Sequence, residues 1–464
     1  MTEDAGVAGD CARGWSSAAA IGSSEPHPAV DAHAGATERG GSERVAVIGA
    51  GYVGLTTAVC LAHLGHTVRC SDRDADKIDR LSGGTPTILE EGLGALLEEG
   101  LAAGRLAFGG SNAWAAEGAG VVFLCVPTPQ GGDERADMRH VLEAAREVAP
   151  VLPSGAVVVN KSTVPVGSAG RVREQFGRAD LEVVSNPEFL REGHAIQDFL
   201  HPARIVVGAD HPDHASRVLS LFTGIDAPRI VADPASAETI KYAANAFLAT
   251  KVSFANAIAA LCEAVGADVR VVAEGIGLDP RVGPAFLRPG PGWGGSCLPK
   301  DTAALLRMAE DAGYDFALLR GVVEVNREQR ERIVAKTARL VGGELSGSRV
   351  ALLGLTFKAG TEDLRDSPAL AIAEQLAARG AEVVGFDPTV DGPLPGLVVA
   401  GDPFEALRGA AVAVVATEWE ELASLDWTKA AQLMARPAVV DARNLLDAAT
   451  MRRAGFVYEG VGVP

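Results

Sequence analysis

The feature that most constrains the fold is a repeated alternation of short apolar strands and helices that begins at Arg44. The segments RVAVIG, TVRCSD, VVFLCV, AVVVNKS, LEVVSN and RIVVGA are β-branched runs of strand length, and helix-compatible segments separate them. This alternation is typical of a parallel sheet covered by helices on both faces. We therefore predict an α/β protein whose first Rossmann-like domain spans residues 44–232.

The strand and helix alternation stops near Asp233 and returns at Arg349. Between them, ASAETIKYAANAFLATKVSFANAIAALCEAVG has no internal Gly or Pro, and Ser236 and Glu238 are suitable first-turn residues. The strand-like segments RVALLGLTF, AEVVGFDP, AVAVVAT and PAVVDAR follow. We predict two Rossmann-like open parallel-sheet domains joined by a long central helix, with a helical domain over 233–340 and the second α/β domain over 341–464.

Composition and charge exclude several classes of partner. Lys and Arg total 42 against 60 Asp and Glu, a formal net charge of −18, which disfavours nucleic acid or an anionic membrane as partner. We find no apolar run near the roughly 18 residues that cross a bilayer, and MTEDAGVAGD lacks the basic start of a secretory signal. With six cysteines spread without close pairs, we expect a cytoplasmic protein. Residues 1–43 lack periodicity, and we predict a disordered extension.

The segment RVAVIGAGYVG carries Gly49, Gly51 and Gly54 in the G-x-G-x-x-G spacing between a strand and a helix. In that motif the first glycine allows a tight turn, the second lets a pyrophosphate approach, and the third allows the helix to pack on the strand. The next strand ends in Asp72, whose carboxylate can accept hydrogen bonds from the adenosine ribose. Arg73 is suited to a 2′-phosphate, but Asp72 would repel one, so NAD is favoured over NADP.

Polar residues follow two later strands of the same sheet. Thr128 lies in CVPTPQ, and Ser162 and Thr163 lie in NKSTVPVG. Ligands on open parallel sheets bind at the carboxyl ends of strands, so we expect these residues to face the nicotinamide. The alternative is that each side chain only stabilises its turn.

The segment PGPGWGGSCLPKD, residues 289–301, places a thiol before a helix. Pro299 suits a first helical turn, so Cys297 lies at the helix N-terminus near Lys300. The helix dipole and the ammonium both favour the thiolate and would lower the thiol pKa. We predict that Cys297 is a nucleophile, with the nearby glycines letting the backbone approach a ligand. The alternative is a small buried apolar cysteine, which is our interpretation of the other five.

The motifs GAGYVG, NKSTVPVG, NPEFLREG, IKYAANAF, GGSCLPKD and GLTFKAGTEDLRDSP occur in the order and approximate spacing found in a known family. Over residues 44–445 the chain resembles the nucleotide-sugar 6-dehydrogenases of the UDP-glucose/GDP-mannose dehydrogenase family. The resemblance implies that the alcohol at sugar C6 gives a hydride to NAD⁺ and that the cysteine thiolate attacks the resulting aldehyde. The thiohemiacetal then gives a second hydride to another NAD⁺, and the thioester is hydrolysed.

The resemblance also bears on the substrate. The segment IKYAANAFLATKVSF and the absence of a GGHC form favour UDP-glucose, which would be converted to UDP-glucuronate. GDP-mannose is the alternative substrate. An alternative of a different class is a catalytically silent protein that binds nucleotide sugars, although the presence of the predicted catalytic residues argues against it.

By resemblance, Lys241 and Asn245 stabilise oxyanion character at C6 and take up the alcohol proton. They lie four residues apart on one helical face; without the motif Lys241 would be a solvated surface lysine. Glu188 and Glu192 have the same spacing if their segment is helical. We assign Glu188 to activating the hydrolytic water and Glu192 to a supporting or cofactor contact.

The resemblance also implies that Thr163 and Asp301 order the hydrolytic water. Asp301 has an equally good interpretation as a first-turn partner of the helix dipole. By the same resemblance, Arg281 in DPRVG would reach the substrate of a partner subunit, with a plain surface arginine as the alternative. The second α/β domain has Gly354 alone where the dinucleotide fingerprint has three glycines, which suits a mononucleotide and predicts a UDP-sugar-binding domain.

The remaining assignments rest on the resemblance. The further cofactor contacts are Tyr52, Val53, Lys77, Lys300 and Arg365, and the further substrate contacts are Phe189, Leu190, Gly294, Phe357, Lys358 and Arg443. Lys358 and Arg443 would contact the diphosphate or uridine side. Arg365 we interpret chiefly as a structural residue that forms an ion pair within its own loop.

Three further observations complete the sequence picture. His211 and His214 are spaced as a ligand pair but lack Cys or carboxylate companions, so we predict no metal site. The apolar stripes of the long helix, together with Arg281, predict a homodimer or higher homo-oligomer. LEEGL at residues 89–93 replaces the Tyr-Glu-Pro-Gly common in the family, so no contact is assigned to that loop.

Overall fold

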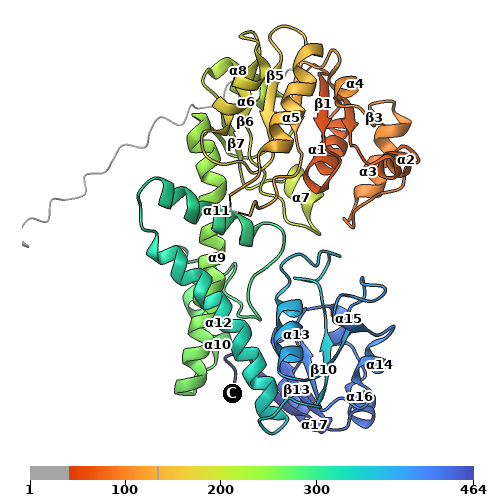
Figure 1. Cartoon of the computed structure of the whole chain (residues 1–464), viewed down its shortest axis with the longest axis vertical. Helices are drawn as coiled ribbons and strands as arrows, with labels where there is room; N and C mark the ends of the chain where they lie inside the picture. Colours follow the sequence, from red (N-terminus) through yellow and green to blue (C-terminus); the bar gives the residue numbers. More distant parts are fainter. Residues whose placement is uncertain (1–40, 133–134) are drawn as a thin grey trace, which may run out of the picture. The chain divides into compact units, whose positions relative to one another are not determined.

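The computed structural model describes residues 41–132 and 135–464. Residues 41–43 aside, the predicted extension over 1–43 lies outside the described residues, as does Cys11. Two parallel sheets dominate the described chain and confirm the predicted fold class (Figure 1). The first sheet contains β1 (Arg44–Ile48), β2 (Thr67–Ser71), β3 (Leu106–Gly109), β4 (Val121–Leu124), β5 (Val157–Asn160), β6 (Glu182–Ser185), β7 (Ile205–Gly208) and β8 (Arg229–Ala232).

The strand order of the first sheet is β3-β2-β1-β4-β5-β6-β7-β8. Its pairs are parallel except for a single antiparallel pair between Ser185 and Gly208, where β6 meets β7. The order reverses between β1 and β4, and ligands of open α/β sheets bind at such a reversal. The helices that accompany this sheet are α1 (Tyr52–His63), α2 (Ala75–Ser82), α3 (Leu93–Ala102), α4 (Asn112–Ala116), α5 (Arg139–Val148), the 3₁₀ turn η1 (Ala149–Val151), α6 (Ser168–Phe176), α7 (Ala195–Leu200) and α8 (Pro212–Ser220).

Side chains alternate across the central strand of this sheet and fill two cores. Val45 and Val47 face the core formed with α1, α3, α7 and α8, whereas Ala46 and Ile48 face the core formed with α4, α5 and α6. All four side chains are fully buried. Burial on both faces explains why the strands read as continuous apolar runs.

The second sheet has the order β11-β10-β9-β12-β13-β14 with parallel pairing throughout. Numbered from its own first strand, this is the 3-2-1-4-5-6 order of a complete Rossmann fold. Its strands are β9 (Arg349–Leu353), β10 (Glu382–Phe386), β11 (Val398–Val399), β12 (Val412–Val415), β13 (Ala438–Asp441) and β14 (Val457–Gly460). Its helices are α13 (Pro368–Ala378), α14 (Pro403–Leu407), α15 (Glu420–Ala423), α16 (Trp427–Leu433) and α17 (Ala448–Arg453).

The predicted central helix is α9 (Pro234–Val265), 32 residues long. It begins earlier than expected, because Asp233 accepts a hydrogen bond from the backbone N–H of Ser236 and so caps the helix, with Pro234 at its first position. Its start packs on β6, β7 and β8, and Ala259 and Cys262 near its end lie in a core of the second sheet. It also packs on α10 (Val269–Gly277), α11 (Leu298–Asp311) and α12 (Ala317–Leu340) (Figure 1).

By length and composition α9 could cross a membrane, which corrects the expectation that the chain holds no such run. Core helices of globular proteins pass the same test. In this helix Glu238, Lys241 and Asn245 are buried inside the protein. The polar face of α9 is therefore buried against other parts of the protein.

Candidate active site

The glycine motif between β1 and α1 has the geometry of a dinucleotide-binding turn. Gly49 has φ +99°, in the left-handed region that glycine adopts without strain. A Cβ on Gly54 would lie 1.8 Å from the Gly49 carbonyl oxygen, so this position admits only glycine. A Cβ on Gly51 would meet nothing within 4 Å, which leaves open space at the N-terminus of α1 where a pyrophosphate fits.

Asp72 lies directly after β2, beside this turn. Its carboxylate accepts hydrogen bonds from the backbone N–H of Ala50 at 2.9 Å and from the Nζ of Lys77 at 3.1 Å. Burial raises the pKa of Asp72, but these bonds and one from the backbone N–H of Asp74 outweigh it, so the pKa is lowered. Arg73 forms ion pairs with two glutamates of α5. Its guanidinium, which could otherwise bind the 2′-phosphate of NADP, is therefore already paired. The residues present therefore fit NAD.

The polar residues after β4 and β5 brace one another. The Thr128 hydroxyl donates to the carbonyl of Thr163 at 2.9 Å, and the Ser162 hydroxyl donates to the carbonyl of Val126 at 2.6 Å. These bonds connect the two strand-end loops, so the side chains have the turn-stabilising role given as the alternative. Their predicted contact with the nicotinamide stays a prediction.

A cavity of about 560 Å³ lies among the predicted site residues, within the usual size range of small-molecule sites. The segment after β6, helix α9, the glycine-rich segment before α11 and the loop after β9 all contribute to its wall. The predicted residues that line it are Glu188, Phe189, Leu190, Glu192, Lys241, Asn245, Gly294, Cys297, Phe357 and Lys358.

A buried ion pair lies in the wall of this cavity. The Nζ of Lys241 is 2.8 Å from Oε1 of Glu188, and these residues are 3% and 6% exposed. The second carboxylate oxygen of Glu188 accepts the backbone N–H of Leu190 at 2.7 Å. Burial opposes both charges, but their attraction outweighs it, so the pKa of Lys241 is raised and the pKa of Glu188 is lowered. Lys241 is therefore a buried, charged group in the cavity wall, and the surface-lysine alternative is wrong.

Asp301, in the first turn of α11, is almost fully buried. Its two oxygens accept hydrogen bonds from the Nδ2 of Asn245 at 2.6 Å and from the Nζ of Lys300 at 2.5 Å. The hydrogen bond between Asn245 and Asp301 links α9 to α11. Asn245 lies one helical turn after Lys241, on the same face of α9. Both interpretations of Asp301, as a site residue and as a first-turn acidic residue, are compatible with its position.

Cys297 is the N-cap residue of α11 and lines the cavity. Burial raises the pKa of its thiol and the charge of Glu188 adds to this, whereas Lys241 and Lys300 lower it; the pKa is raised overall. The expectation of a lowered pKa is therefore wrong, because desolvation outweighs the helix terminus and the two cations. The other described cysteines are buried in the cores, whereas Cys297 is partly accessible.

The segment carrying Glu188 and Glu192 is extended and turned, not helical, between β6 and α7. Glu188 and Glu192 therefore do not lie on one face of a helix, as they would have done if the segment were helical. Glu192 instead contacts Ser296, whose hydroxyl donates to Oε1 at 2.7 Å. Thr361 and Arg365 also contact the Glu192 carboxylate, at 3.3 and 3.5 Å.

The glycines before Cys297 allow close approach of the protein's own backbone. A Cβ on Gly294 would lie 2.1 Å from the carbonyl oxygen of Asp366, and one on Gly295 would lie 2.8 Å from the Phe357 ring. The N–H of Gly295 donates to the Arg365 carbonyl at 3.1 Å. These glycines therefore seat the cysteine segment against the loop after β9, a contact that the sequence did not predict.

The sequence of the chain matches three domain models that belong to one protein family. They are described as the NAD binding domain, central domain and UDP binding domain of the UDP-glucose/GDP-mannose dehydrogenase family, and they match residues 43–226, 235–328 and 351–448. The chain belongs to the UDP-glucose/GDP-mannose dehydrogenase family. Family membership confirms the predicted resemblance, the NAD cofactor and the enzyme class of NAD-dependent nucleotide-sugar dehydrogenase.

Individual members of the UDP-glucose/GDP-mannose dehydrogenase family are similar over almost the whole chain. A UDP-glucose 6-dehydrogenase of Rhizobium meliloti (strain 1021) is 44% identical, with 91% of this chain and 100% of that protein covered. UDP-glucose 6-dehydrogenase TuaD of Bacillus subtilis (strain 168) is 41% identical, with 91% and 94% covered. The solved UDP-glucose dehydrogenase of Pyrobaculum islandicum is 38% identical, with a TM-score of 0.84 and 93% and 100% covered.

In this member of the UDP-glucose/GDP-mannose dehydrogenase family, three predicted arginines lie outside the cavity wall. Arg281 is exposed and forms an ion pair with Asp279. Arg443 donates to the carbonyls of Ala416 and Phe357, which fixes the loop after β9. Arg365 forms the ion pair with Asp363 in its own loop, at 2.7 Å, as interpreted from the sequence.

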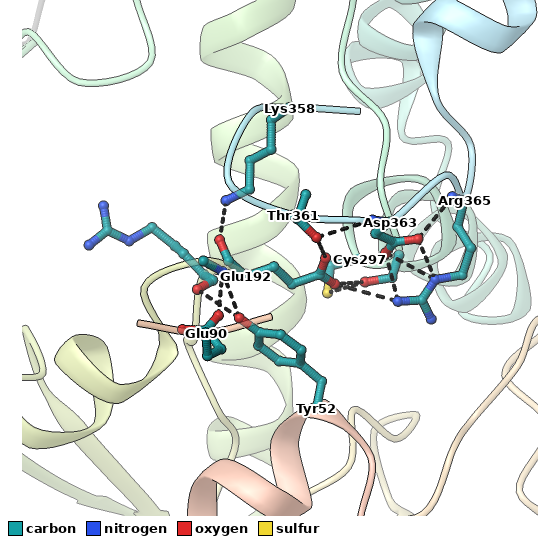
Figure 2. A network of polar contacts seen from close by, with 11 residues as sticks. Tyr52, Glu90, Glu192, Cys297, Lys358, Thr361, Asp363 and Arg365 are labelled. Atoms are coloured by element: carbon teal, nitrogen blue, oxygen red, sulfur yellow. Dashed lines mark hydrogen bonds and ion pairs between the residues drawn. The ribbon is translucent and has the colours of Figure 1, made fainter. Parts of the chain in front are cut away.

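Sequence reasoning missed several polar groups near the cavity. Glu90, in the loop left without an assignment, accepts hydrogen bonds from the backbone N–H groups of Gly193 and Ala195 and so holds the segment that carries Glu192 (Figure 2). Lys161 lines the cavity, and burial lowers its pKa to about 8. Arg204 also lines it and lies over the Phe189 ring at 3.5 Å.

One of these groups carried a usable signal in the sequence, because Lys161 lies inside the NKSTVPVG motif. The contacts of Glu90 and Arg204 depend on segments distant in sequence, so no local pattern reports them. Ser296 lies next to the nucleophile in GGSCLPKD, but which way its hydroxyl points depends on Glu192, more than a hundred residues away.

Proposed function

We propose that the protein oxidises UDP-glucose to UDP-glucuronate with two NAD⁺ and water, through thiohemiacetal and thioester intermediates on Cys297. The observation that carries the proposal is the partly accessible thiol of Cys297 in one cavity with the Lys241–Glu188 ion pair. The names of the relatives, UDP-glucose 6-dehydrogenases over nearly their whole lengths, support the choice of sugar.

Gly51 and Asp72 would hold NAD⁺, which would supply the hydride acceptor for the oxidation at C6 when bound. Lys241 stabilises the negative charge that develops on the C6 oxygen, and Asn245 orients that oxygen. The raised pKa of Lys241 keeps its ammonium protonated at neutral pH.

Cys297 then attacks the aldehyde carbon, and the thiohemiacetal holds the sugar while the cofactor exchanges. Loss of a second hydride gives the thioester. Glu188 activates the hydrolytic water, and Thr163 and Asp301 order it. The lowered pKa of Glu188 keeps it ionised at neutral pH, the state that a general base requires.

The nucleotide end of the substrate binds against the second sheet. Phe357 and Lys358 line the cavity from the loop after β9, and Arg443 supports that loop through the Phe357 carbonyl. The cations of this loop attract the diphosphate within an otherwise acidic protein. The UDP binding domain described for residues 351–448 supports this placement.

We further propose that the protein functions in the cytoplasm as a homodimer or higher homo-oligomer. Phe247, Phe254 and Leu261 recur every seven residues on α9 and are 65%, 51% and 56% exposed, an apolar stripe suited to a second copy of the same helix. Arg281, which is exposed, then reaches the partner's substrate. Free thiols among the described cysteines support a reducing compartment.

The test is the yield of NADH from limiting nucleotide sugar. With excess NAD⁺, the purified protein should form about two NADH per UDP-glucose and little NADH from GDP-mannose at the same concentration. A yield of one would contradict the thioester route. Faster oxidation of GDP-mannose would establish the alternative substrate, and binding of UDP-glucose without NADH formation would establish a silent binding protein.

A further inference from the structure

The hydroxyl of Ser296 lies between the nucleophile and a carboxylate. Its Oγ is 3.4 Å from Sγ of Cys297 and 2.7 Å from Oε1 of Glu192. Since the ionised Glu192 only accepts hydrogen bonds, Ser296 donates to it, and the free lone pair of Ser296 receives the thiol proton. The three groups thus form a directed chain from thiol to hydroxyl to carboxylate.

We propose that Ser296 relays the thiol proton of Cys297 to Glu192 and so generates the thiolate that attacks the aldehyde. This inference rests on the proposed function of Cys297 as nucleophile. The S–H bond breaks as its proton passes to Ser296 Oγ, while the original Ser296 proton passes to Glu192 Oε1. The products are a thiolate that accepts a hydrogen bond from Ser296 and a neutral Glu192, so charge and protons balance.

The surroundings of Glu192 suit a proton acceptor. Its side chain is only 10% exposed and lies beside the equally buried Asp363, with Arg365 contacting both carboxylates. Two neighbouring carboxylates cannot both ionise easily, so one of them holds a proton readily. Burial raises the pKa of Glu192, and the charge of Asp363 raises it further despite the hydrogen bond from Ser296.

The Glu192 side chain is also fixed in place by groups on other segments. Thr361 donates to Oε2 at 3.3 Å, and the Nζ of Lys358 donates to the backbone carbonyl of Glu192 at 2.5 Å. These contacts leave Oε1 directed at Ser296. The Glu192 carboxylate therefore accepts the Ser296 hydrogen bond in one fixed orientation.

The other charged groups that face the thiol are committed elsewhere. Lys241 and Glu188 pair with each other, and Lys300 donates to Asp301. Arg365, which also faces Cys297, pairs with Asp363 and Glu192. Within the described part of the chain, Ser296 is the hydrogen-bond partner of the Cys297 sulfur. Ser296 is therefore the group positioned to take the thiol proton.

The test is the pH dependence of Cys297 alkylation by iodoacetamide, followed by mass spectrometry of the peptide that carries it. The resting protein is used without NAD⁺ or nucleotide sugar, so the result is independent of whether UDP-glucose is oxidised. Ser296→Ala should slow alkylation at neutral pH about tenfold and raise the midpoint of the rate profile by about one pH unit. Glu192→Gln should do the same, and the double variant should add nothing further.

Two variants serve as controls. Ser296→Thr keeps the hydroxyl and should retain the wild-type midpoint, while Thr361→Val removes a different hydrogen bond to Glu192 and should change the rate less than about twofold. Thermal unfolding of each variant verifies folding. A wild-type midpoint for Ser296→Ala would overturn the relay, and a shift in Ser296→Ala without one in Glu192→Gln would overturn Glu192 as the acceptor.

Discussion

At the scale of single residues, the buried Lys241–Glu188 pair decides the electrostatics of the cavity. Each partner is nearly inaccessible to water, so each charge depends on the other for stabilisation. Removing one partner of such a pair leaves an uncompensated buried charge, which costs more than the pair itself contributes. The ion pair therefore keeps both Lys241 and Glu188 ionised near Cys297.

The pair predicts a specific response to mutation and pH. Lys241→Met should lower the free energy of unfolding at neutral pH by about 3–5 kcal/mol because Glu188 is left charged and buried, and Lys241→Met with Glu188→Gln should recover most of it. Since the folded pKa of Glu188 is lowered, its contribution is present above its ordinary pKa and is lost as pH falls through the folded value. The folded pKa of Lys241 is raised, so its contribution is lost only at high pH.

Denaturant unfolding across acid and neutral pH measures this response. The wild type should lose stability on acidification more steeply than the double variant, which has neither charge. Equal stabilities of Lys241→Met and the wild type at neutral pH would contradict the account of the pair.

Many of the residues that line the cavity were predictable from the sequence, but the direction of the thiol pKa was not. The motif GGSCLPKD identified Cys297 and Lys300, and both lie where a helix N-terminus was expected. The direction of the thiol pKa was wrong because desolvation depends on how deeply the whole chain buries a position. Sequence spacing contains no measure of that depth.

At the scale of elements, α9 combines two roles on different faces. Its buried polar face brings Lys241 and Asn245 to the cavity, and its exposed apolar stripe of Phe247, Phe254 and Leu261 is left for another surface. The heptad spacing of the stripe matches the seam of paired helices. The helix was predictable from its long uninterrupted pattern, whereas the extended segment around Glu188 was not, because its conformation follows from tertiary hydrogen bonds such as those to Glu90.

The stripe predicts that one charge will dissociate the oligomer. Phe254→Asp should convert the protein to a monomer in sedimentation velocity, because burying the new carboxylate costs more than the about 1.5–3 kcal/mol that one apolar side chain contributes. The matched control is Val398→Asp on β11, where an apolar side chain is 63% exposed away from the stripe.

The control should sediment as the wild type does. A wild-type protein that is an active monomer, or a Phe254→Asp variant that remains an oligomer, would contradict the proposed interface. Loss of activity together with dissociation would support the reach of Arg281 into a neighbouring cavity.

At the scale of the whole molecule, the cavity exists because the cysteine segment is seated against the loop after β9. Gly294 and Gly295 allow that approach, with Asp366 and Phe357 as the groups they meet. Both sheets were predictable from their strand runs, although the edge strands β3, β8, β11 and β14, of two to four residues each, were not among the predicted runs. The contact between the glycines and the loop joins segments that no sequence pattern connects.

This seating predicts the effect of one added methyl group. Gly294→Ala places a Cβ about 2.1 Å from a backbone carbonyl oxygen, so backbone must move; we expect a loss of about 1–3 kcal/mol in unfolding free energy and a large loss of activity. Gly170→Ala in α6 meets nothing within 4 Å and should be neutral or stabilising by about 0.5–1 kcal/mol. Differential scanning calorimetry and NADH formation measure both, and equal behaviour of the two variants would contradict the role of Gly294.

The central claim is that the Cys297 sulfur forms a covalent bond with the sugar carbon that is being oxidised. The most direct measurement is the rate of NADH formation from UDP-glucose by Cys297→Ser, alongside NAD⁺ binding to the same preparation. We predict a fall in turnover of at least about 10³-fold with NAD⁺ affinity unchanged. Turnover at the wild-type rate, with two NADH per sugar, would contradict the account.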